Sequence, residues 1–453
     1  MAKTLLQGGI VLTMDEKIGD FKKADVLIEG DKILDVKPNI EADGAEVVDA
    51  TDMIVLPGFV DSHRHAWESV IRNVGADWSL QKYLGSIYYG NIGSRRRPED
   101  DYIGNLLGAL EAMESGVTTM LDWSMIISRD HTEQMIKGLQ DSGMRAVFAH
   151  GCPGDGDYWN GESVVENEAD VRATAEKHFS SKDQLLTMGL AIRGPEFSSW
   201  ETSEAEIRLA RDLDAVCSMH LGFGTWGGAA RSIEKLNKAG LLGPDLNFAH
   251  ANAVSAEEMR MLAEKGGSIS VTPEIEMMMG HGYPATGLAM ENGVKPALGV
   301  DVVTSTGGDM FAQMKFTLQA ERSRVNEKQL AQGEMPGPPL HISARQILEM
   351  ATIEGAKALR LDHKTGSLTP GKQADIQMIR TTDFNMFPVN DPIGAVVQCA
   401  HTGNVDTVYV AGKAVKQGGE LINVDRTRIR RLADEARNSI FEQYGNPDEL
   451  WLL

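Results

Sequence analysis

The chain of 453 residues carries four histidines and an aspartate in positions suited to metal binding. His63 and His65 lie two apart in the segment PGFVDSHRHAW, and on an extended strand residues two apart point to the same face. His220, His250 and Asp301 end three further apolar segments, AVCSMH, LNFAH and ALGVD. Any one of these histidines is more often a hydrogen-bonded core residue, but their shared placement favours a site. Three imidazoles and a carboxylate suit Zn²⁺, Fe²⁺ or Co²⁺ and leave one position open for water.

Eight short β-rich segments alternate with helix-like segments through the middle of the chain. The predicted strands span 58–63, 117–122, 145–149, 186–192, 215–220, 246–250, 268–272 and 296–301. Helical spacing of apolar residues predicts helices at 128–143, 203–214, 255–265 and 309–324. Eight strand–helix units over about 250 residues predict an α/β fold, a (β/α)8 TIM-like barrel whose functional groups sit at the carboxyl ends of the strands. An open doubly wound sheet is the alternative, and the lack of a GxGxxG segment after the first strand disfavours it.

Both ends of the chain predict a smaller β-domain. Residues 25–36 and 406–415 alternate apolar and polar side chains about a central glycine, which is the pattern of a β-hairpin. Neither hairpin has a core of its own, so we expect the two to pair. The predicted domains are a small β-sandwich from 1–56 plus 366–423, a metal-dependent catalytic barrel at 57–365 and a C-terminal helical tail at 424–453.

The net charge limits the possible partners. The sequence has 44 lysines and arginines against 65 aspartates and glutamates, and the resulting charge of −21 disfavours phosphate backbones and anionic membrane surfaces. The one basic cluster, Arg95-Arg96-Arg97, is typical of a solvated loop before a helix. We therefore expect a small-molecule substrate, with no nucleic acid and no membrane as a partner.

The cysteines and the first residues predict the compartment. Cys152, Cys217 and Cys399 are an odd number, widely spaced and without a CxxC pair, which argues against a disulfide framework and a thiolate metal site. No apolar run reaches the ~20 residues of a membrane span, and the segment MAKTLLQGGIVLTMDEK lacks the pattern of a signal peptide. These features predict a cytoplasmic protein.

Three motifs carry a resemblance to a known family. PGFVDSHRH resembles the PGFI(D/N)xHxH signature of the amidohydrolase superfamily, ALGVD resembles its LGTD, and GSLTPGKQADIQMI (366–379) resembles its GSLxxGKxADLV. The resemblance covers nearly the whole chain and points to the cytosine deaminase-like and triazine hydrolase-like branch. It implies metal ligands at His63, His65, His220 and Asp301, and for His250 a role in binding the hydrolytic water or the substrate.

Two departures from the family's motifs bear on the reaction. The fourth-strand segment TMGLAIRGPE has no lysine to bridge two metals, so we expect one divalent ion per chain, zinc first, with iron or cobalt as alternatives. Deaminases of this branch usually carry HxxE on strand five, where the glutamate moves a proton to a ring nitrogen. This chain reads HLGF there, and Phe223 cannot carry a proton, which disfavours nucleobase-type deamination.

Three functions stay open at this point. The first is an amidohydrolase-type hydrolase with one metal that cleaves a non-peptide C–N bond of an apolar aromatic small molecule, namely an amide, urea, carbamate or substituted N-heterocycle. The second is an N-heterocycle deaminase that releases ammonia, with Glu274 or Glu276 as proton carrier. The third, from another class, is a catalytically inactive scaffold of the same fold, which the retention of all four ligands disfavours. We also expect a homo-oligomer, a dimer or larger.

Two of the candidate residues have predicted catalytic roles. A bound divalent ion lowers the pKa of a water ligand from ~15.7 towards ~7. Asp301 is expected to take the proton of the attacking water and to deliver it to the leaving nitrogen, because a general base must lie within hydrogen-bond reach. His250 is expected to polarise the attacked group and to stabilise the charge that develops there, with a structural histidine as the alternative.

Aromatic residues gather just beyond the predicted strands, on the side of the histidines. A pocket with aromatic walls and few polar groups suits a planar, weakly polar ligand. The predicted substrate-binding residues are Trp67, Trp123, Phe197, Phe223, Trp226, Glu274, Glu276 and His281. For any single tryptophan, packing of a loop onto the barrel rim is an equal alternative, and for either glutamate a solvated loop position is the alternative.

Overall fold

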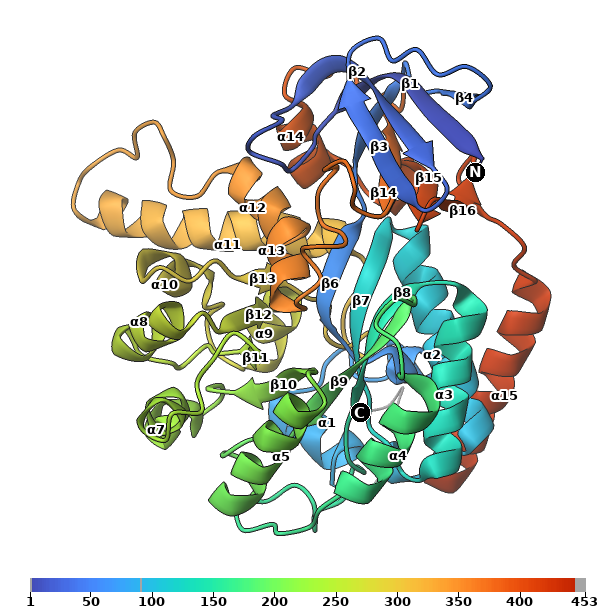
Figure 1. Cartoon of the computed structure of the whole chain (residues 1–453). Helices are drawn as coiled ribbons and strands as arrows, with labels where there is room; N and C mark the ends of the chain where they lie inside the picture. Colours follow the sequence, from blue (N-terminus) through green and yellow to red (C-terminus); the bar gives the residue numbers. More distant parts are fainter. Residues whose placement is uncertain (1, 90–91, 445–453) are drawn as a thin grey trace.

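The computed structural model describes residues 2–89 and 92–444, and eight parallel strands form its centre (Figure 1). These strands are β6 (Phe59–Arg64), β7 (Val117–Trp123), β8 (Arg145–His150), β9 (Leu186–Ile192), β10 (Val216–Leu221), β11 (Leu246–His250), β12 (Ser268–Val271) and β13 (Ala297–Leu298). Each strand pairs with the next in chain order. An isolated bridge between Arg64 and Asp301 brings the first strand beside the last, so that the ring is nearly closed. The predicted (β/α)8 barrel is confirmed.

The eighth strand is shorter than the sequence predicts. The apolar pattern extends over 296–301, but β13 has only two residues. Gly299 follows it and lies so close to β6 that a Cβ there would meet the carbonyl oxygen of His63 at 2.7 Å. Asp301 then has a φ of 68°, a left-handed conformation that regular strands do not contain. The strand therefore ends early because the chain turns the carboxylate of Asp301 towards β6.

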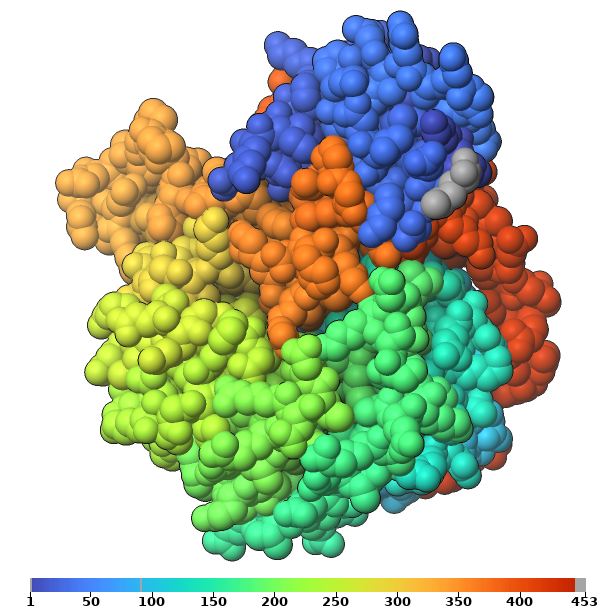
Figure 2. Space-filling view, in the orientation of Figure 1, coloured from blue at the N-terminus to red at the C-terminus, as the bar shows by residue number. Residues whose placement is uncertain are grey.

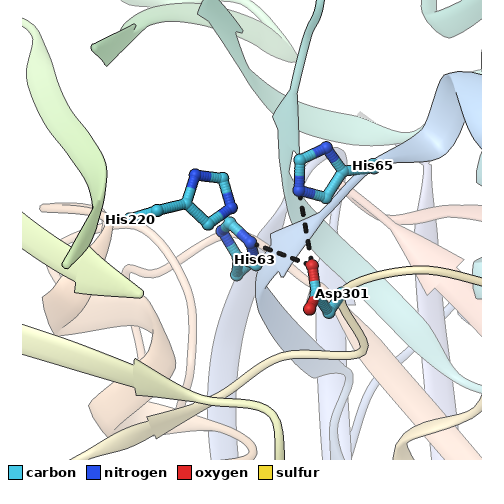
Figure 3. A group of neighbouring side chains, drawn as sticks. All are labelled: His63, His65, His220 and Asp301. Carbon is cyan, nitrogen blue, oxygen red and sulfur yellow. Dashed lines mark ion pairs between the residues drawn. The ribbon is translucent and has the colours of Figure 1, made fainter. Parts of the chain in front are cut away.

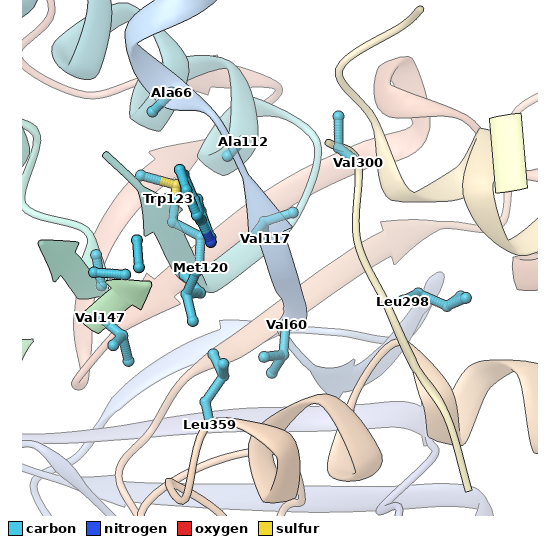
Figure 4. Packing of buried hydrophobic residues seen from close by; sticks show 14 of the residues in the cluster. Val60, Ala66, Ala112, Val117, Met120, Trp123, Val147, Leu298, Val300 and Leu359 are labelled. Atoms are coloured by element: carbon cyan, nitrogen blue, oxygen red, sulfur yellow. The ribbon is translucent and has the colours of Figure 1, made fainter. Parts of the chain in front are cut away.

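Apolar side chains fill the barrel. Every residue of β7, β8 and β10 is buried, as expected for parallel strands that are covered on both faces. Val60, Met120 and Val147 from three adjacent strands belong to one continuous hydrophobic core with Leu359 (Figure 4). Burial of such surface contributes about 25 cal/mol per Å² and holds the strand ends in fixed positions.

Helices surround the barrel and alternate with its strands (Figure 1). They are α1 (Leu80–Ile87), α2 (Pro98–Glu114), α3 (Arg129–Ser142), α4 (Glu168–His178), α5 (Trp200–Asp212), α6 (Gly227–Ala230), α7 (Ser232–Lys238), α8 (Ala256–Lys265), α9 (Pro273–Met279), α10 (Thr286–Glu291), α11 (Met310–Ala331), α12 (Ala344–Met350) and α13 (Ile353–Ala358), with short 3-10 helices η1 (Ala66–Ile71) and η2 (Ile92–Ser94). The four helices expected from the sequence correspond to α3, α5, α8 and α11. The last of these is longer than expected, and its far end with the loop that follows projects from the body of the molecule (Figure 2).

The two ends of the chain meet in one mixed sheet of nine strands. Its strands are β1 (Lys3–Val11), β2 (Phe21–Glu29), β3 (Lys32–Lys37), β4 (Glu46–Asp49), β5 (Met53–Pro57), β14 (Ile376–Arg380), β15 (Val405–Val410), β16 (Lys413–Gln417) and β17 (Glu420–Leu421). The order is β17-β16-β15-β14-β5-β1-β2-β3, with β4 beside β1. Antiparallel pairing of β5 with β14 joins the two termini, and the two predicted hairpins are β2–β3 and β15–β16.

The C-terminal segment returns to the barrel. After α14 (Pro392–Gly394), η3 (Ala395–Cys399) and η4 (Thr402–Asn404), the helix α15 (Arg426–Tyr444) packs against α2. It covers much of the predicted tail at 424–453, and positions 445–453 lie outside the described residues. The domain boundaries themselves stay a prediction. Within 2–89 and 92–444, no helix combines the length and the apolar character that crossing a membrane would require.

Candidate active site

Four side chains converge at the carboxyl end of the barrel (Figure 3). His63 and His65 come from the end of β6, His220 from β10, and Asp301 from the turn after β13. One ligand atom of each residue lies within 4.8 Å of the others, and all four residues are buried. The Nε2 atoms of His63 and His65 are 3.2 and 3.3 Å from Asp301 Oδ1. The structure thus brings the four predicted ligands together in one group.

This group has the chemistry that a divalent cation requires. Both ring nitrogens of His63 are buried and lack a hydrogen bond of good geometry. Burial lowers the pKa of His63 and takes that of His220 well below its ordinary value, so both imidazoles are neutral. Burial alone would raise the pKa of Asp301, but contacts with His63 and His65 hold it well below its usual value. Neutral imidazoles and an ionised carboxylate are the forms that bind metal, so these residues fit one divalent ion.

His250 lies beside the group formed by His63, His65, His220 and Asp301. Contacts to its Nδ1 atom hold the orientation of its ring. His250 ends β11 with a φ of 77°, and its Nε2 is 3.8 Å from Asp301 Oδ2. Its Nδ1 is 3.1 Å from Thr272 Oγ1 and 3.3 Å from Glu276 Oε1. These contacts fix the ring and leave Nε2 facing the carboxylate of Asp301.

Glu276 and His281 both lie next to His250. Burial raises the pKa of Glu276 to about 7 and lowers the pKa of His281 to about 3. The rings of His250 and His281 have centroids 4.7 Å apart, and both residues form a second potential ligand group with Asp301. The Glu276 carboxylate therefore contacts His250 rather than the cavity.

A small inner cavity, of about 30 Å³, opens over this site. Its lining residues are His65, Leu80, Tyr83, Leu84, Tyr88, Tyr89, Trp159, Phe197, His220, Phe223, His250, His281 and Asp301. Phe223 is 3% exposed, and its ring centroid is 5.1 Å from that of His250 and 5.4 Å from that of His281. An aromatic ring therefore occupies the wall of the cavity next to these two histidines.

The structure divides the predicted substrate-binding residues into two sets. Phe197, Phe223 and His281 line the inner cavity, and Trp226 lines the wider space outside it. Trp123 packs against His220, with their ring centroids 4.5 Å apart, and does not line either cavity.

Trp67 and Glu274 also lie outside both linings. Trp67 is fully buried, with the guanidinium of Arg96 stacked 3.8 Å from its ring centroid. Glu274 accepts a 3.0 Å hydrogen bond from the side chain of Gln313, and burial raises its pKa to about 7.

Several lining residues were not predicted from the sequence. Tyr83 and Tyr88 come from α1 and the residue after it, and both line the inner cavity. The Tyr83 hydroxyl donates a 2.7 Å hydrogen bond to Glu68, a fully buried carboxylate that Thr304 also contacts. The amphipathic pattern of α1 carries no signal beyond ordinary packing, so the sequence does not distinguish these tyrosines from core residues.

Comparison with known proteins now places the chain in a family. Residues 54–415 match the sequence profile of the Amidohydrolase family. The chain belongs to this family. It is a hydrolase of the amidohydrolase type that acts on carbon–nitrogen bonds, and the predicted resemblance is confirmed.

The relatives of this amidohydrolase include deaminases. It is 29% identical over 439 residues to the 5-methylthioadenosine/S-adenosylhomocysteine deaminase of Pyrococcus abyssi, an alignment that covers 94% of this chain and 96% of the relative. It is 28% identical over 467 residues to the 5'-deoxyadenosine deaminase of Methanosarcina mazei, with 97% and 99% covered.

Solved structures share its fold. An adenosine deaminase from Xanthomonas campestris with bound zinc has a TM-score of 0.85 at 21% identity, over 97% of this amidohydrolase and 99% of that chain. A mutant of atrazine chlorohydrolase TrzN from Arthrobacter aurescens TC1, in complex with zinc and atraton, has a TM-score of 0.83 at 22% identity, over 96% and 100%.

Proposed function

We propose that this amidohydrolase uses one zinc ion to cleave a non-peptide C–N bond in an apolar aromatic small molecule, with an amide, urea, carbamate or substituted N-heterocycle as the reacting group. The observation that carries the proposal is the position of the four-ligand group at the inner end of a cavity with mainly aromatic and aliphatic walls. Zinc in the two solved relatives supports the choice of metal, with iron and cobalt as alternatives.

Asp301 and His250 have the positions that proton transfer needs. A divalent cation, when bound, lowers the pKa of a water ligand towards neutrality. Asp301 takes the proton of the attacking water and returns it to the leaving nitrogen. When Glu276 is ionised it accepts the Nδ1–H of His250, whose Nε2 then accepts a hydrogen bond from the water. When Glu276 is protonated it donates to Nδ1, and Nε2–H can polarise the attacked group.

A substrate panel tests this proposal. Zinc-loaded protein is offered acetanilide, phenylurea, phenyl carbamates and aminated N-heterocycles, and released amine and ammonia are measured separately. We expect turnover of at least one compound and its loss in His63→Ala, which removes a ligand. Turnover that persists in metal-free protein would contradict the proposal.

A deaminase is the second candidate, which the relatives favour. The wall position of Phe223 argues against it, because no carboxylate replaces the missing proton carrier there. Phe223→Glu separates the two. With an aryl amide or urea as substrate, it should raise KM several-fold, because apolar contact is lost and an unpaired charge is buried. A gain in ammonia release from an aminated heterocycle, with metal content unchanged, would instead favour the deaminase.

The cellular compartment and the oligomeric state of the enzyme are proposed from fewer observations. The three cysteines are free, with Cys152 and Cys217 buried, which supports a reducing, cytoplasmic compartment. We also propose a homo-oligomer, which light scattering of the purified protein can test.

A further inference from the structure

A second, larger cavity continues outward from the inner one. This outer chamber has a volume of about 710 Å³, against about 30 Å³ for the inner cavity. The two share the lining residues Leu80, Leu84, Tyr89, Trp159 and Phe197. A substrate that places its reacting bond at Asp301 must therefore hold most of its body in the outer chamber.

The walls of the outer chamber are aromatic, with a single acid among them. Trp159, Phe197 and Trp226 line it, with ring centroids of neighbouring pairs 5.8 and 6.1 Å apart. Among the described residues that line the chamber, Glu196 is the only charged one. Aromatic faces attract cations, and an adjacent carboxylate supplies the opposite charge.

Glu196 has neutral partners only. Its carboxylate accepts hydrogen bonds from the Gly222 amide at 3.0 Å and from the Ser232 hydroxyl at 2.8 Å. No ion pair to Glu196 occurs within residues 2–89 and 92–444. Burial raises its pKa to about 7, as expected for a carboxylate that lacks a cation. A positively charged group in the chamber would act as the counter-ion of the Glu196 carboxylate.

We propose that the outer chamber binds a protonated amine carried by the substrate, with Glu196 as its counter-ion and the rings of Trp159, Phe197 and Trp226 around it. This inference rests on the proposed function, because it assigns a cationic substituent to the substrate of the same site. The net charge of −21 favours the approach of such a cation. The recognised class is an arylalkylamine-type group attached at a distance from the C–N bond that is cleaved.

A purely structural role is the competing explanation. Gly222 has a φ of 68° in the turn that leads from His220 to Phe223, and Glu196 holds its amide. In that case the loss of the carboxylate would disturb the wall at Phe223 and weaken every aromatic ligand equally. A cation and a neutral ligand of the same shape therefore distinguish the two explanations.

The experiment measures binding to the zinc-loaded protein by calorimetry at pH 8. The probes are 2-phenylethylammonium and the neutral 2-phenylethanol, and the quantity is the ratio of their Kd values. The variants are Glu196→Gln, whose amide oxygen can still accept from Gly222 and Ser232, and Ser232→Ala, which keeps the carboxylate. Glu201→Gln is the matched control, since it removes one negative charge from an exposed position on α5.

We expect the wild-type protein to bind the ammonium at least tenfold more tightly than the alcohol. Glu196→Gln should abolish this preference, and Ser232→Ala and Glu201→Gln should keep it. An equal loss of both probes in Glu196→Gln, an unchanged ratio, or no cation preference in the wild type would overturn the inference. A cation preference without turnover of any C–N substrate would refute the proposed function alone.

Discussion

Two buried charged groups lie at opposite ends of the barrel, and their surroundings differ. At the amino end, Arg145 at the start of β8 donates hydrogen bonds of 2.7 and 3.1 Å to Asp375. The amide of Ala411 donates to the same carboxylate at 2.7 Å. At the carboxyl end, the ion-pair partners of Asp301 among the described residues are His63, His65 and His250, and burial lowers the pKa of His63 and His250.

These different surroundings distinguish a charged pair that stabilises the fold from a group suited to bind a metal ion. The Arg145–Asp375 pair is satisfied within the chain and joins the barrel to the terminal sheet, so it needs no ligand. At Asp301, the nitrogen and oxygen atoms of four side chains converge from separate strands in an arrangement suited to a metal ion. The first group should therefore govern folding, and the second should govern catalysis.

The largest effect is expected from Asp301→Asn. The amide cannot take a proton and is a poorer metal ligand, so kcat/KM should fall by about 10²–10⁴-fold. The free energy of unfolding of the metal-free protein should fall only modestly, because contacts with His63 and His65 favour the ionised carboxylate but the asparagine oxygen can still accept from the same rings. Steady-state kinetics with zinc analysis checks the loss of kcat/KM, and urea unfolding checks the change in the free energy of unfolding. Retained turnover would show that Asp301 does not transfer the proton.

Arg145→Met should show the opposite behaviour. It leaves Asp375 as an uncompensated buried charge, so the free energy of unfolding should fall by about 3–5 kcal/mol. Activity per folded, zinc-loaded molecule should stay within twofold, since Arg145 is at the other end of the barrel. Arg145→Met/Asp375→Asn should recover part of the loss, because the asparagine oxygen can still accept from Ala411. A specific loss of kcat in folded Arg145→Met would refute the separation.

The barrel could be predicted from the sequence because its strands are continuous apolar runs followed by helices. The exception, β13, shows the limit of that approach. Its apolar pattern continues through Val300, but the backbone leaves the strand at Gly299, where contact with His63 excludes a side chain. This contact joins residues more than 200 positions apart, and no local pattern encodes it.

The convergence of the four candidate ligands could be predicted from the sequence for a similar reason. Strand alternation puts His63 and His65 on one face, and parallel strands bring their carboxyl ends together. Tyr83 and Glu196 were missed, because a helix with ordinary amphipathic spacing and a glutamate after β9 resemble common surface elements. Only the three-dimensional structure shows that both border the cavities.

Zinc should stabilise the protein only through the candidate ligands at the carboxyl end of the barrel. At a zinc concentration about 100 times Kd, the free energy of unfolding should rise by about 2.7 kcal/mol. The same zinc-dependent increment is expected in Arg145→Met, because that variant keeps all four candidate metal ligands. No increment is expected in His63→Ala, which lacks one of them. Urea unfolding with and without zinc measures the increments. An equal zinc effect in His63→Ala would place the stabilising metal elsewhere.

The smallest effect, and the one with a pH signature, is expected from Glu274→Gln. Glu274 is a partly buried acid at the carboxyl end of the barrel whose side-chain partner is the neutral Gln313, and unlike Asp301 it has a raised pKa. Its pKa is raised from 4.5 to about 7 by burial. Between these two values the folded state binds more protons than the unfolded state. Stability from this group is therefore present at low pH and is lost as pH rises from about 4.5 to about 7.

Replacing Glu274 with glutamine should remove this pH-dependent loss. At pH 8 the variant should be more stable than the wild type by about 1–2 kcal/mol, after allowance for partial exposure, and at pH 4.5 the two should be nearly equal. Urea unfolding of the metal-free proteins at pH 4.5, 6 and 8 measures the difference. Asp375→Asn is the matched control with the opposite sign at pH 8, because it leaves Arg145 without its partner. If Glu274→Gln were destabilising at pH 8, an acid with neutral partners would contribute to the fold as the Arg145–Asp375 pair does, and the distinction between the two ends would not hold.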